Sequence, residues 1–246
     1  MNVLLSTTYF GPIEWYQMLC QADHAKLECY ESFQKQTYRN RCIIATANGP
    51  QSLTVPVSHN DELRIKGEKH ALHTSLIKDI RLSDHGDWRR LHWNALTSAY
   101  GESPFFDYYQ DDLRPFFESR QWTYLLDFNE AIREVVCQLL DVHPHLSRTS
   151  TYHREPDDGW IDFRSAISPK HPTAQSPKRP ISQTTNPPND QTTNPPNDQT
   201  TNLQNDQTSN RPYYQVYRQK HGFLPNLSIL DLLFNMGPEG IFWLVA

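Results

Sequence analysis

The sequence is poor in apolar residues, and the shortage is concentrated in one segment. Only 37% of its 246 residues are apolar, which is low for a globular chain. Residues 168–212 hold nine of the 18 prolines, no aromatic residue and almost no apolar side chain. Without them roughly 44% of the chain is apolar, as in ordinary domains. The 6 Trp, 12 Tyr and 11 Phe need a core, which excludes a chain that is disordered throughout.

The chain also lacks an excess of positive charge and long apolar runs. It carries 23 Lys and Arg against 28 Asp and Glu, a net charge of −5, which argues against a chain built mainly to bind nucleic acid or an anionic membrane. Its longest apolar runs, such as 241–246, fall far short of the roughly 20 residues that cross a bilayer. No Lys or Arg precedes Lys26, so no signal peptide is visible. We expect a cytoplasmic protein without a membrane span.

Cysteine is scarce and its spacing indicates no site. The four cysteines, Cys20, Cys29, Cys42 and Cys137, include no Cys-x-x-Cys pair, so neither a zinc site nor a redox motif is predicted. We expect buried free thiols rather than a catalytic cysteine, because free cysteine usually behaves as a small core residue.

Standard catalytic and nucleotide-binding motifs are absent too. The sequence has no G-x-x-x-x-G-K-[ST] loop, no G-x-G-x-x-G turn and no G-x-S-x-G nucleophile elbow. The pairs His143 with His145 and His70 with His73 have spacings that could suggest a metal site, but no second ligand pair supports either, so surface or loop histidines are favoured. We predict no metal and no cofactor.

A repeat of period eight occupies part of the apolar-poor segment. QTTNPPND occurs at 183–190 and again at 191–198, QTTNLQND follows at 199–206, and a fourth copy begins before residue 210. Solenoid repeats are longer and carry apolar positions that stack, whereas these copies bury too little to offset the entropy of ordering. We interpret 168–212 as a flexible insert. The alternative, a proline-rich docking site, lacks a suitable P-x-x-P spacing.

Two ordered blocks, 1–165 and 213–246, flank the insert. The second is too short to bury a core alone and must pack on the first. Strand-like and helix-like patterns alternate in the first block, so we predict a single interrupted α/β domain, with a mixed α+β arrangement as the variant.

Individual elements follow from periodicity and capping. Strands are predicted over Val3–Ser6, Cys42–Ala47, Ser52–Val57 and Lys78–Leu82. Helices are predicted over Pro12–Cys20 and from Trp88 to Gly101, the second with Asp87 as its cap. A further helix is predicted after Ser103-Pro104, with a break near Pro115. Asp127 with Glu130 has capping-box spacing, and Ser228 with Asp231 repeats the device at a last helix that ends at Gly237-Pro238.

Two groups of residues near the first strand and the first long helix could bind a ligand. The turn Tyr9–Gly11 lies between the first strand and first helix, where ligands sit in open α/β sheets, although a simple tight turn also explains it. Asn40 and Arg41 form the second group with Arg89, Arg90 and His92, because guanidinium groups suit carboxylate or phosphate. His92 is either a base in a pocket or a core histidine.

A third group flanks the insert. Asp162 and Arg164 precede it, Lys170 lies at its start, and Tyr213–Gln215 and His221 follow it. Polar residues interleaved with aromatic ones are typical of the walls of a cleft, but salt-bridged loop anchors have the same composition.

Several stretches of the chain resemble the WbqC-like protein family. They are TTYFGPIEWYQML, YRNRCIIATANGPQSLTVPV, WRRLHWNALTSAYGESPFFDYY, DFRSAISPK, YYQVY and HGFLPNLSILDLLFNMGPEG. The last is the most specific, a leucine-rich helix bracketed by 226–228 and 237–238. The resemblance covers both ordered blocks and skips the repeat.

The resemblance implies transfer of a small acyl or aminoacyl group, of glycine type, in the assembly of O-antigen or a related surface glycan. The implied partners are an activated small-molecule donor and a sugar or nucleotide-sugar acceptor, with no nucleic acid and a possible homodimer. A second hypothesis is a non-catalytic binding or scaffold protein of envelope biogenesis, because the apolar tail 241–245 either docks as a strand on its own domain or marks an interface. Nucleotidyl transfer is a weaker third option, because the first loop lacks a histidine pair.

The transferase hypothesis assigns roles to residues in these stretches. His92 or His221 would be the catalytic base, arginines would hold phosphate or carboxylate, and Tyr9–Gly11 would offer backbone donors. The predicted substrate-binding residues are Tyr9, Gly11, Asn40, Arg41, Tyr100, Asp162, Arg164, Lys170, Tyr214 and Gln215. An enzyme would bring Arg41, His92, Arg164 and His221 to one concave pocket.

Overall fold

The structure is a computed structural model of the chain and describes residues 1–58, 75–169 and 211–245. Four of its strands form a parallel sheet, in the order β7-β2-β1-β8. The strands are β1 (Asn2–Ser6), β2 (His24–Glu28), β7 (Leu146–Arg148) and β8 (Trp160–Asp162). β1 pairs in parallel with β2 along its whole length and with β8 through residue 4. The expected mixed α/β class is confirmed.

Two short antiparallel pairs extend the strand content. The first is the hairpin of β3 (Arg41–Thr46) and β4 (Gly49–Thr54), and the second pairs β5 (Val57–Ser58) with β6 (Arg81–Leu82). The hairpin confirms the strands predicted around the Asn48-Gly49 turn, where Gly49 has a positive φ of 101°. The strand predicted over Lys78–Leu82 is correct only at its end, because Ile77–Asp79 form a 3₁₀ turn.

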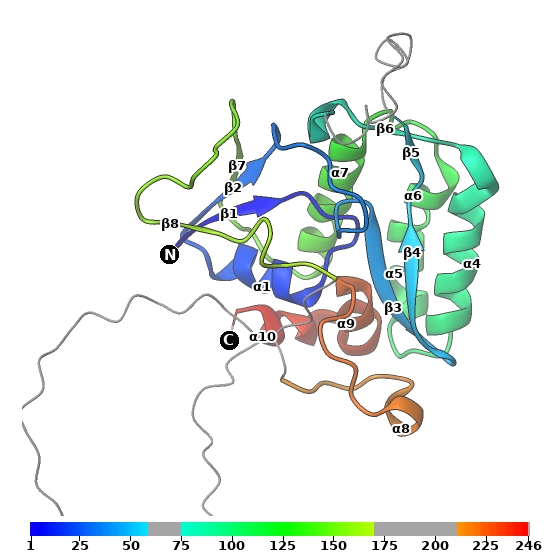
Figure 1. Cartoon of the computed structure of the whole chain (residues 1–246). Coiled ribbons are helices and arrows are strands. Elements are labelled where there is room, and N and C mark those ends of the chain that lie inside the picture. Colours follow the sequence, from blue (N-terminus) through cyan, green and yellow to red (C-terminus); the bar gives the residue numbers. More distant parts are fainter. Residues whose placement is uncertain (59–74, 170–210, 246) are drawn as a thin grey trace, which may run out of the picture.

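Helices surround the sheet and the hairpin. They are α1 (Ile13–Gln21), α4 (Trp88–Tyr100), α5 (Phe106–Leu113), α6 (Pro115–Glu118), α7 (Leu125–Leu139), α8 (Arg218–His221), α9 (Ile229–Met236) and α10 (Ile241–Leu244), with short 3₁₀ turns at His85–Asp87 and Gly237–Gly240. Figure 1 shows α4, α5 and α6 on one side of the molecule, with the β3–β4 hairpin between α4 and the sheet.

The C-terminal helix α9 lies in the middle of the core. Its apolar residues Ile229, Leu230, Leu232, Leu233 and Phe234 have no exposed surface, and it contacts α1, α5 and β3. Phe105 N donates to Phe234 O across 3.0 Å. Residues that follow the insert in the sequence therefore complete the core built by the first block.

Two of the three capping predictions are wrong, and the third is confirmed in part. α7 begins at Leu125 rather than after Asp127, so Asp127 lies in the first turn and Glu130 pairs with Arg133. Asp87 does precede α4, but it has a left-handed φ of 48° and makes no capping bond, its carboxylate pairing with Arg90 instead. Ser228 caps α9 as predicted, accepting from Leu230 N, whereas the Asp231 carboxylate turns into the core.

The apolar tail is neither a strand nor an unpartnered surface. Residues 241–244 form α10, which packs on α1. Gln17 Nε2 donates to Trp243 O at 2.8 Å, and Leu244 is fully buried. Within the described ranges no helix is long and apolar enough to cross a membrane. The insert interpreted from 168–212 lies almost wholly outside the described residues, as do Lys170, His70 and His73.

Candidate functional site

The carboxyl ends of the parallel strands carry polar side chains. β1 ends at Ser6, β2 at Glu28 and β8 at Asp162. The chain leaves β1 for β2 and β7 on one side, and then returns to β8 on the other side of β1. β1 and β8 therefore flank the point where the strand order reverses, and ligands of open parallel sheets bind outside the carboxyl ends at this point.

Arg164 joins the ends of β2 and β8. Its Nε and Nη2 form a bidentate pair with Asp162, at 3.0 Å to Oδ1 and 2.6 Å to Oδ2, and its Nη1 lies 3.4 Å from Glu28 Oε2. Nη1 also donates to His153 O at 2.6 Å. Burial opposes ionisation of Asp162, but the hydrogen bonds from Arg164 outweigh it and lower the pKa of that carboxyl. Both groups are therefore charged at neutral pH.

Glu28 is a carboxylate with no exposed surface. Its Oε1 accepts from Tyr30 N and from Thr149 Oγ1, both at 2.9 Å, and its Oε2 accepts from His153 N at 3.0 Å. These donors and Arg164 replace the water that burial removes, which is the condition for a stable buried charge. Glu28 thus fixes the segment 149–153 against the end of β2.

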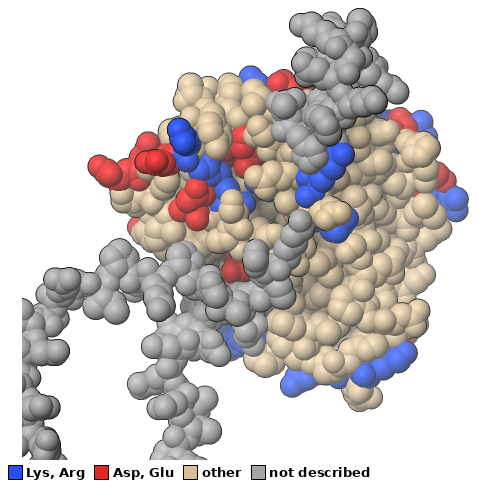
Figure 2. Space-filling view, viewed as in Figure 1, with Lys and Arg blue, Asp and Glu red and all other residues tan. Residues whose placement is uncertain are grey.

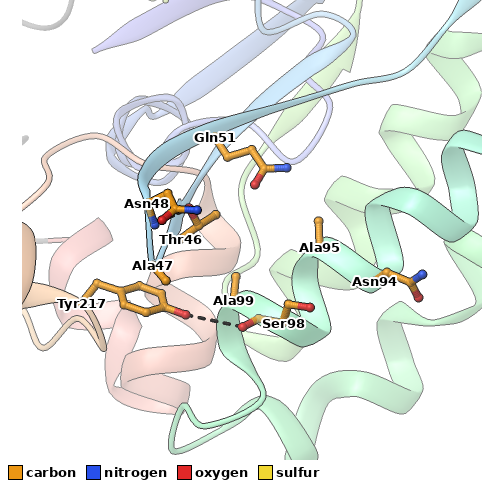
Figure 3. A pocket seen from close by; sticks show the side chains of 9 residues that line it. All are labelled: Thr46, Ala47, Asn48, Gln51, Asn94, Ala95, Ser98, Ala99 and Tyr217. Atoms are coloured by element: carbon orange, nitrogen blue, oxygen red, sulfur yellow. Dashed lines mark hydrogen bonds between the residues drawn. The ribbon is translucent and has the colours of Figure 1, made fainter.

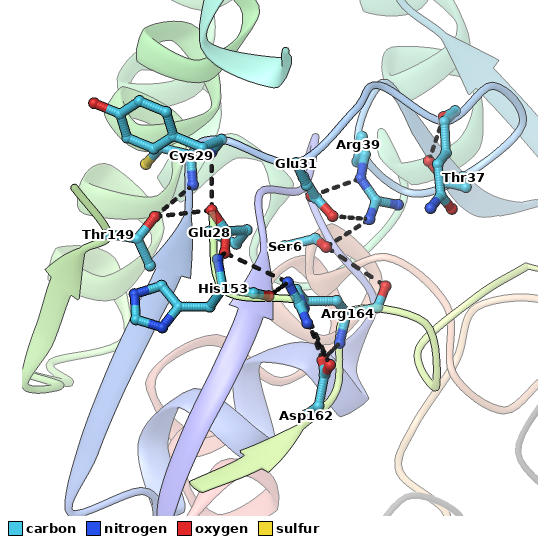
Figure 4. A network of polar contacts seen from close by, with 12 residues as sticks. Ser6, Glu28, Cys29, Glu31, Thr37, Arg39, Thr149, His153, Asp162 and Arg164 are labelled. Carbon is cyan, nitrogen blue, oxygen red and sulfur yellow. Dashed lines mark hydrogen bonds and ion pairs between the residues drawn. The ribbon is translucent and has the colours of Figure 1, made fainter. Parts of the chain in front are cut away.

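A second buried ion pair lies beside the first. Arg39, with 3% of its surface exposed, donates from Nε and Nη2 to the two oxygens of Glu31 at 2.8 and 2.6 Å. Nη2 also donates to Ser6 Oγ at 2.7 Å, and that hydroxyl lies 3.5 Å from Arg164 O. Ser6 therefore connects the two ion pairs, as Figure 4 shows. Nη1 of Arg39 makes no hydrogen bond within the described ranges.

We call Ser6, Glu28, Glu31, Arg39, Asp162 and Arg164 the strand-end cluster. It holds two guanidinium groups and three carboxylates, so it can offer forks to a carboxylate or phosphate and oxygens to an ammonium group. Figure 2 shows charged side chains of both signs gathered over the sheet end. Around the cluster the exposed Tyr152 ring lies 5.6 Å from the Arg164 guanidinium, and Asp162 is partly exposed. A ligand could reach it from this side.

Among the predicted site residues, Asp162 and Arg164 belong to this cluster. Arg41 does not, because it reaches Thr54 Oγ1 across the hairpin at 3.0 Å. Asn40 is buried and its Nδ2 donates to Val55 O at 2.8 Å, while its Oδ1 has no partner in the described part of the chain. Tyr214 is exposed. Lys170 lies outside the described residues.

The predicted base His92 is a core histidine. Its Nδ1 lies 2.9 Å from Tyr9 Oη, and its ring packs edge-on against Trp88 at 5.2 Å. Burial lowers the pKa of His92 to about 4 and raises that of Tyr9. His92 is therefore neutral at physiological pH and packed on the interior face of α4, in agreement with the second of its two interpretations.

The turn Tyr9–Gly11 between β1 and α1 is filled by side chains of the turn and of the residue before it. Phe10 is buried with a positive φ of 41°, and a side chain at Gly11 would overlap the Thr8 hydroxyl. Glycine fits position 11 because the Thr8 side chain occupies the space that a Cβ would need. The carbonyl oxygen of Gly11 accepts a hydrogen bond from Ile229 N at 2.9 Å. The turn holds α9 in place.

Tyr100 and Gln215 serve a buried carboxylate. Tyr100 Oη donates to Asp231 Oδ1 at 2.8 Å, while Tyr213 Oη and Gln215 Nε2 donate to Oδ2 at 2.5 and 3.0 Å. All four residues are buried. Burial raises the pKa of Asp231 to about 6 against the lowering effect of these donors. The group ties 213–215 to α4 and α9.

His221 lies at the far end of the hairpin. Its Nε2 and Lys220 Nζ both reach Ala47 O, at 3.0 and 2.6 Å. Arg41, His92 and His221 thus contact β3–β4 or the turn between them, whereas Arg164 contacts the ends of β2 and β8. Arg41 and His92 both contact Thr54, but no residue in the described ranges contacts all four of the residues expected in one pocket.

Sequence reasoning missed Ser6, Glu28, Glu31 and Arg39. Glu28 is the last residue of β2 and Glu31 follows it. Because β2 was not predicted, the strand end that positions both residues was not recognised. Arg39 directly precedes the predicted Asn40–Arg41 pair. The alternation of polar and apolar residues along 24–28 (His-Ala-Lys-Leu-Glu) is the sequence signal that could have indicated β2.

The cysteines take no part in the cluster's ion pairs. All four are free, Cys29, Cys42 and Cys137 are buried, and burial raises the pKa of Cys20 to about 12 and that of Cys137 to about 11. Their thiols stay protonated at neutral pH, which disfavours nucleophilic chemistry. Among the described residues no three His, Cys, Asp or Glu side chains are grouped to hold a metal ion.

The fold and the cluster define an α/β protein with a charged site at the carboxyl edge of a parallel sheet. The pattern of the WbqC-like protein family matches residues 7–242, so the chain belongs to this family. It is also similar to an uncharacterized protein of Mycobacterium tuberculosis, with 28% identity over 207 residues that cover 84% of this chain and 81% of the relative. No solved structure matches the chain significantly.

Proposed function

We propose that this WbqC-like protein transfers a small acyl or aminoacyl group, of glycine type, from an activated donor to a sugar or nucleotide-sugar acceptor in the assembly of a surface glycan. The observation that carries the proposal is the strand-end cluster, because it places two arginines and three carboxylates at the switch point of the sheet. An aminoacyl donor presents both an ammonium group and an anionic leaving group, which this mixture of charges complements.

Arg39 and Arg164 are the groups suited to the anionic part of the donor. Each is held in a bidentate pair that fixes its guanidinium plane, so little side-chain entropy remains to be lost on binding. Nη1 of Arg39 is left for the ligand. Asp162, partly exposed at the end of β8, is suited to the ammonium group.

The transfer step needs a base for the acceptor. The acceptor oxygen or nitrogen forms a bond to the acyl carbon, the bond from that carbon to the leaving group breaks, and the leaving group keeps the electron pair. The proton of the nucleophile passes to His153 in this proposal. Its Nδ1 lies 3.5 Å from Asp157 Oδ1, a partner that orients an imidazole as a base. Its side chain is partly exposed, so an acceptor arriving from solvent can reach it, and Figure 4 shows it beside Glu28.

The test uses the organism that carries this chain, because it supplies the natural donor and acceptor. A strain without the chain is expected to lose the small acyl substituent from its surface glycan, measured by mass spectrometry of the purified glycan. Arg164→Lys, which keeps the charge and loses the fork, is expected to restore less than a tenth of it. Arg114→Lys is the matched control, since Arg114 pairs with Glu118 on the exposed surface, and should restore it fully.

Two outcomes would contradict the proposal. If the glycan is unchanged in the strain without the chain, the reaction is not this one. If Arg164→Lys accumulates to the wild-type level and restores the substituent as well as the wild type does, the chain acts without this site, as a scaffold would.

A further inference from the structure

A pocket of about 350 Å³ lies away from the strand-end cluster. The hairpin turn forms one wall with Asn48 and Gln51, helix α4 forms another with Asn94 and Ser98, and Tyr217 closes one end. Figure 3 shows the Tyr217 ring reaching from the C-terminal segment toward Ser98, whose carbonyl oxygen accepts from its hydroxyl at 3.4 Å. None of the cluster residues lines this pocket.

Four polar side chains of the lining have no hydrogen-bond partner in the described part of the chain, whereas the hydroxyls of Thr46 and Tyr217 are bonded. The side chains of Asn48, Gln51, Asn94 and Ser98 make no hydrogen bond within the described part of the chain. Three carboxamides and a hydroxyl therefore offer donors and acceptors to the same space, while no charged side chain lines it. Carboxamides present a donor and an acceptor side by side, which complements hydroxyl groups that are donors and acceptors themselves.

The shape of the pocket comes from small residues. Ala47, Ala95 and Ala99 lie between the polar side chains, and a longer side chain at any of them would occupy the space. The volume is at the lower end of the roughly 300–1,000 Å³ of ligand pockets, so it suits one small ring. Tyr217 is the one aromatic side chain in the lining. A nucleobase could therefore stack on one side only and could not be held between two aromatic rings.

We infer that this pocket binds a neutral, polyhydroxylated ring, a single sugar unit, through Asn48, Gln51, Asn94 and Ser98. The inference deepens the proposed function, on which it rests for what the sugar is used for: the unit belongs to the acceptor. The hairpin β3–β4 connects the two places, since Arg39 and Asn40 directly precede β3 and Gln51 lies on β4. An acceptor of more than one unit would be held at a distance from its reacting group.

Ligand-observed saturation-transfer NMR on the full chain tests the binding directly, without transfer activity. The probes are galactose, mannose and N-acetylglucosamine as neutral sugars, glucuronate and glucosamine as charged sugars, and adenosine as a flat ring. At least one neutral sugar is expected to bind, about tenfold more weakly to Gln51→Ala/Asn94→Ala and not at all to Ala95→Trp. Thr97→Ala, an exposed change on the same helix outside the pocket, should bind like the wild type.

The variants separate this inference from the proposed function. Arg164→Lys should bind the neutral sugar normally. If Arg164→Lys loses the sugar while Gln51→Ala/Asn94→Ala keeps it, the sugar binds at the strand-end cluster and the inference is wrong, though the proposed function stands. Binding of charged sugars or adenosine alone, or of no probe, also overturns it. Sugar binding that depends on Gln51 and Asn94 supports the pocket even if the glycan of the deletion strain is unchanged.

Discussion

Asp231 shows how a single buried carboxylate links segments that are far apart in the sequence. It has no exposed surface and three hydroxyl or amide donors, and no cation among the described residues pairs with it. The donors come from α4 and from the segment that follows the insert. Such a group costs free energy to ionise, so its protonation state should affect stability.

The contribution of Asp231 to stability decreases as the pH rises. Its pKa is raised from 3.8 to about 6 in the folded state, so the folded state holds the proton more tightly. The stability that the protonated Asp231 contributes to the folded state is fully present below pH 4 and is lost as the pH rises through 6. The advantage of the wild type over Asp231→Asn in free energy of unfolding should therefore shrink by about 2–3 kcal/mol between pH 4 and pH 7.

Urea unfolding of both proteins at several pH values measures this difference, which cancels the other titrating groups. A constant difference across the range would show that folding does not raise the pKa of Asp231, and would contradict this prediction. Tyr108→Phe, an exposed tyrosine, serves as a control whose difference from the wild type should be small at every pH.

The ion pair of Arg39 and Glu31 allows stability to be separated from function. Removal of Arg39 alone leaves Glu31 buried without a partner and should cost about 3–5 kcal/mol. Arg39→Met/Glu31→Leu removes both charges and should cost less than about 1.5 kcal/mol, because apolar side chains of similar size can replace a buried pair. Urea denaturation of the single and double variants measures both. A double variant less stable than Arg39→Met would contradict this interpretation.

At the scale of elements, Ser228 fixes the most buried helix. Its hydroxyl accepts from Leu230 N at the start of α9 and donates to Phe10 O at 2.7 Å, and its backbone N donates to Ile43 O at 2.8 Å. One residue thus joins α9 to the first turn and to β3.

Ser228→Ala should cost about 1–3 kcal/mol in free energy of unfolding, because it removes a helix cap and leaves a buried carbonyl without its donor. Asp87→Asn is the matched control at the start of α4, where the side chain makes no capping bond, and should cost less than about 0.5 kcal/mol. Thermal unfolding compares the stability of the two variants. Equal losses of stability would mean that the cap of α9 stabilises the protein no more than Asp87 does.

The tail shows a second element held by its contacts. Removal of 241–246 takes away the buried Leu244 and the carbonyl partners of Gln17 and Gln21, so we expect a melting temperature several degrees lower or an insoluble chain. Phe242→Ser changes a residue with 59% of its surface exposed and should have little effect. If the truncated chain keeps its stability and loses only self-association, the tail is an interface.

The elements predicted best from the sequence are those that are long or are bounded by clear turn and capping residues. The first strand, α1, α4, the hairpin at Asn48-Gly49 and α9 follow from periodicity and turn residues. β2, β7 and β8 do not, because they are three to five residues long and are held by pairing with distant strands. Since Glu28 and Asp162 acquire their place from these pairings, only part of the cluster was foreseen: Asp162 and Arg164 through local composition, and Glu28, Glu31 and Arg39 not at all.

At the scale of the whole molecule, the repeat should be dispensable for folding. Residues on either side of it, up to 169 and from 211, belong to the described structure. Deletion of 183–210 changes loop-closure entropy only logarithmically, so the melting temperature and the sugar binding should stay within error of the full chain. A drop of several degrees would mean that the repeat contributes to the fold, and that its interpretation as an insert is wrong.

The functional role of the strand-end cluster can be tested by its effect on the surface glycan. The acyl substituent of the surface glycan is measured in the deletion strain complemented with Arg39→Met/Glu31→Leu, or with Arg133→Met/Glu130→Leu, which removes another Arg–Glu pair of low exposure, on α7. With both variants folded and equally abundant, we expect the first to restore less than a tenth of the substituent and the second to restore it fully. Full restoration by the first would contradict a functional role of the cluster.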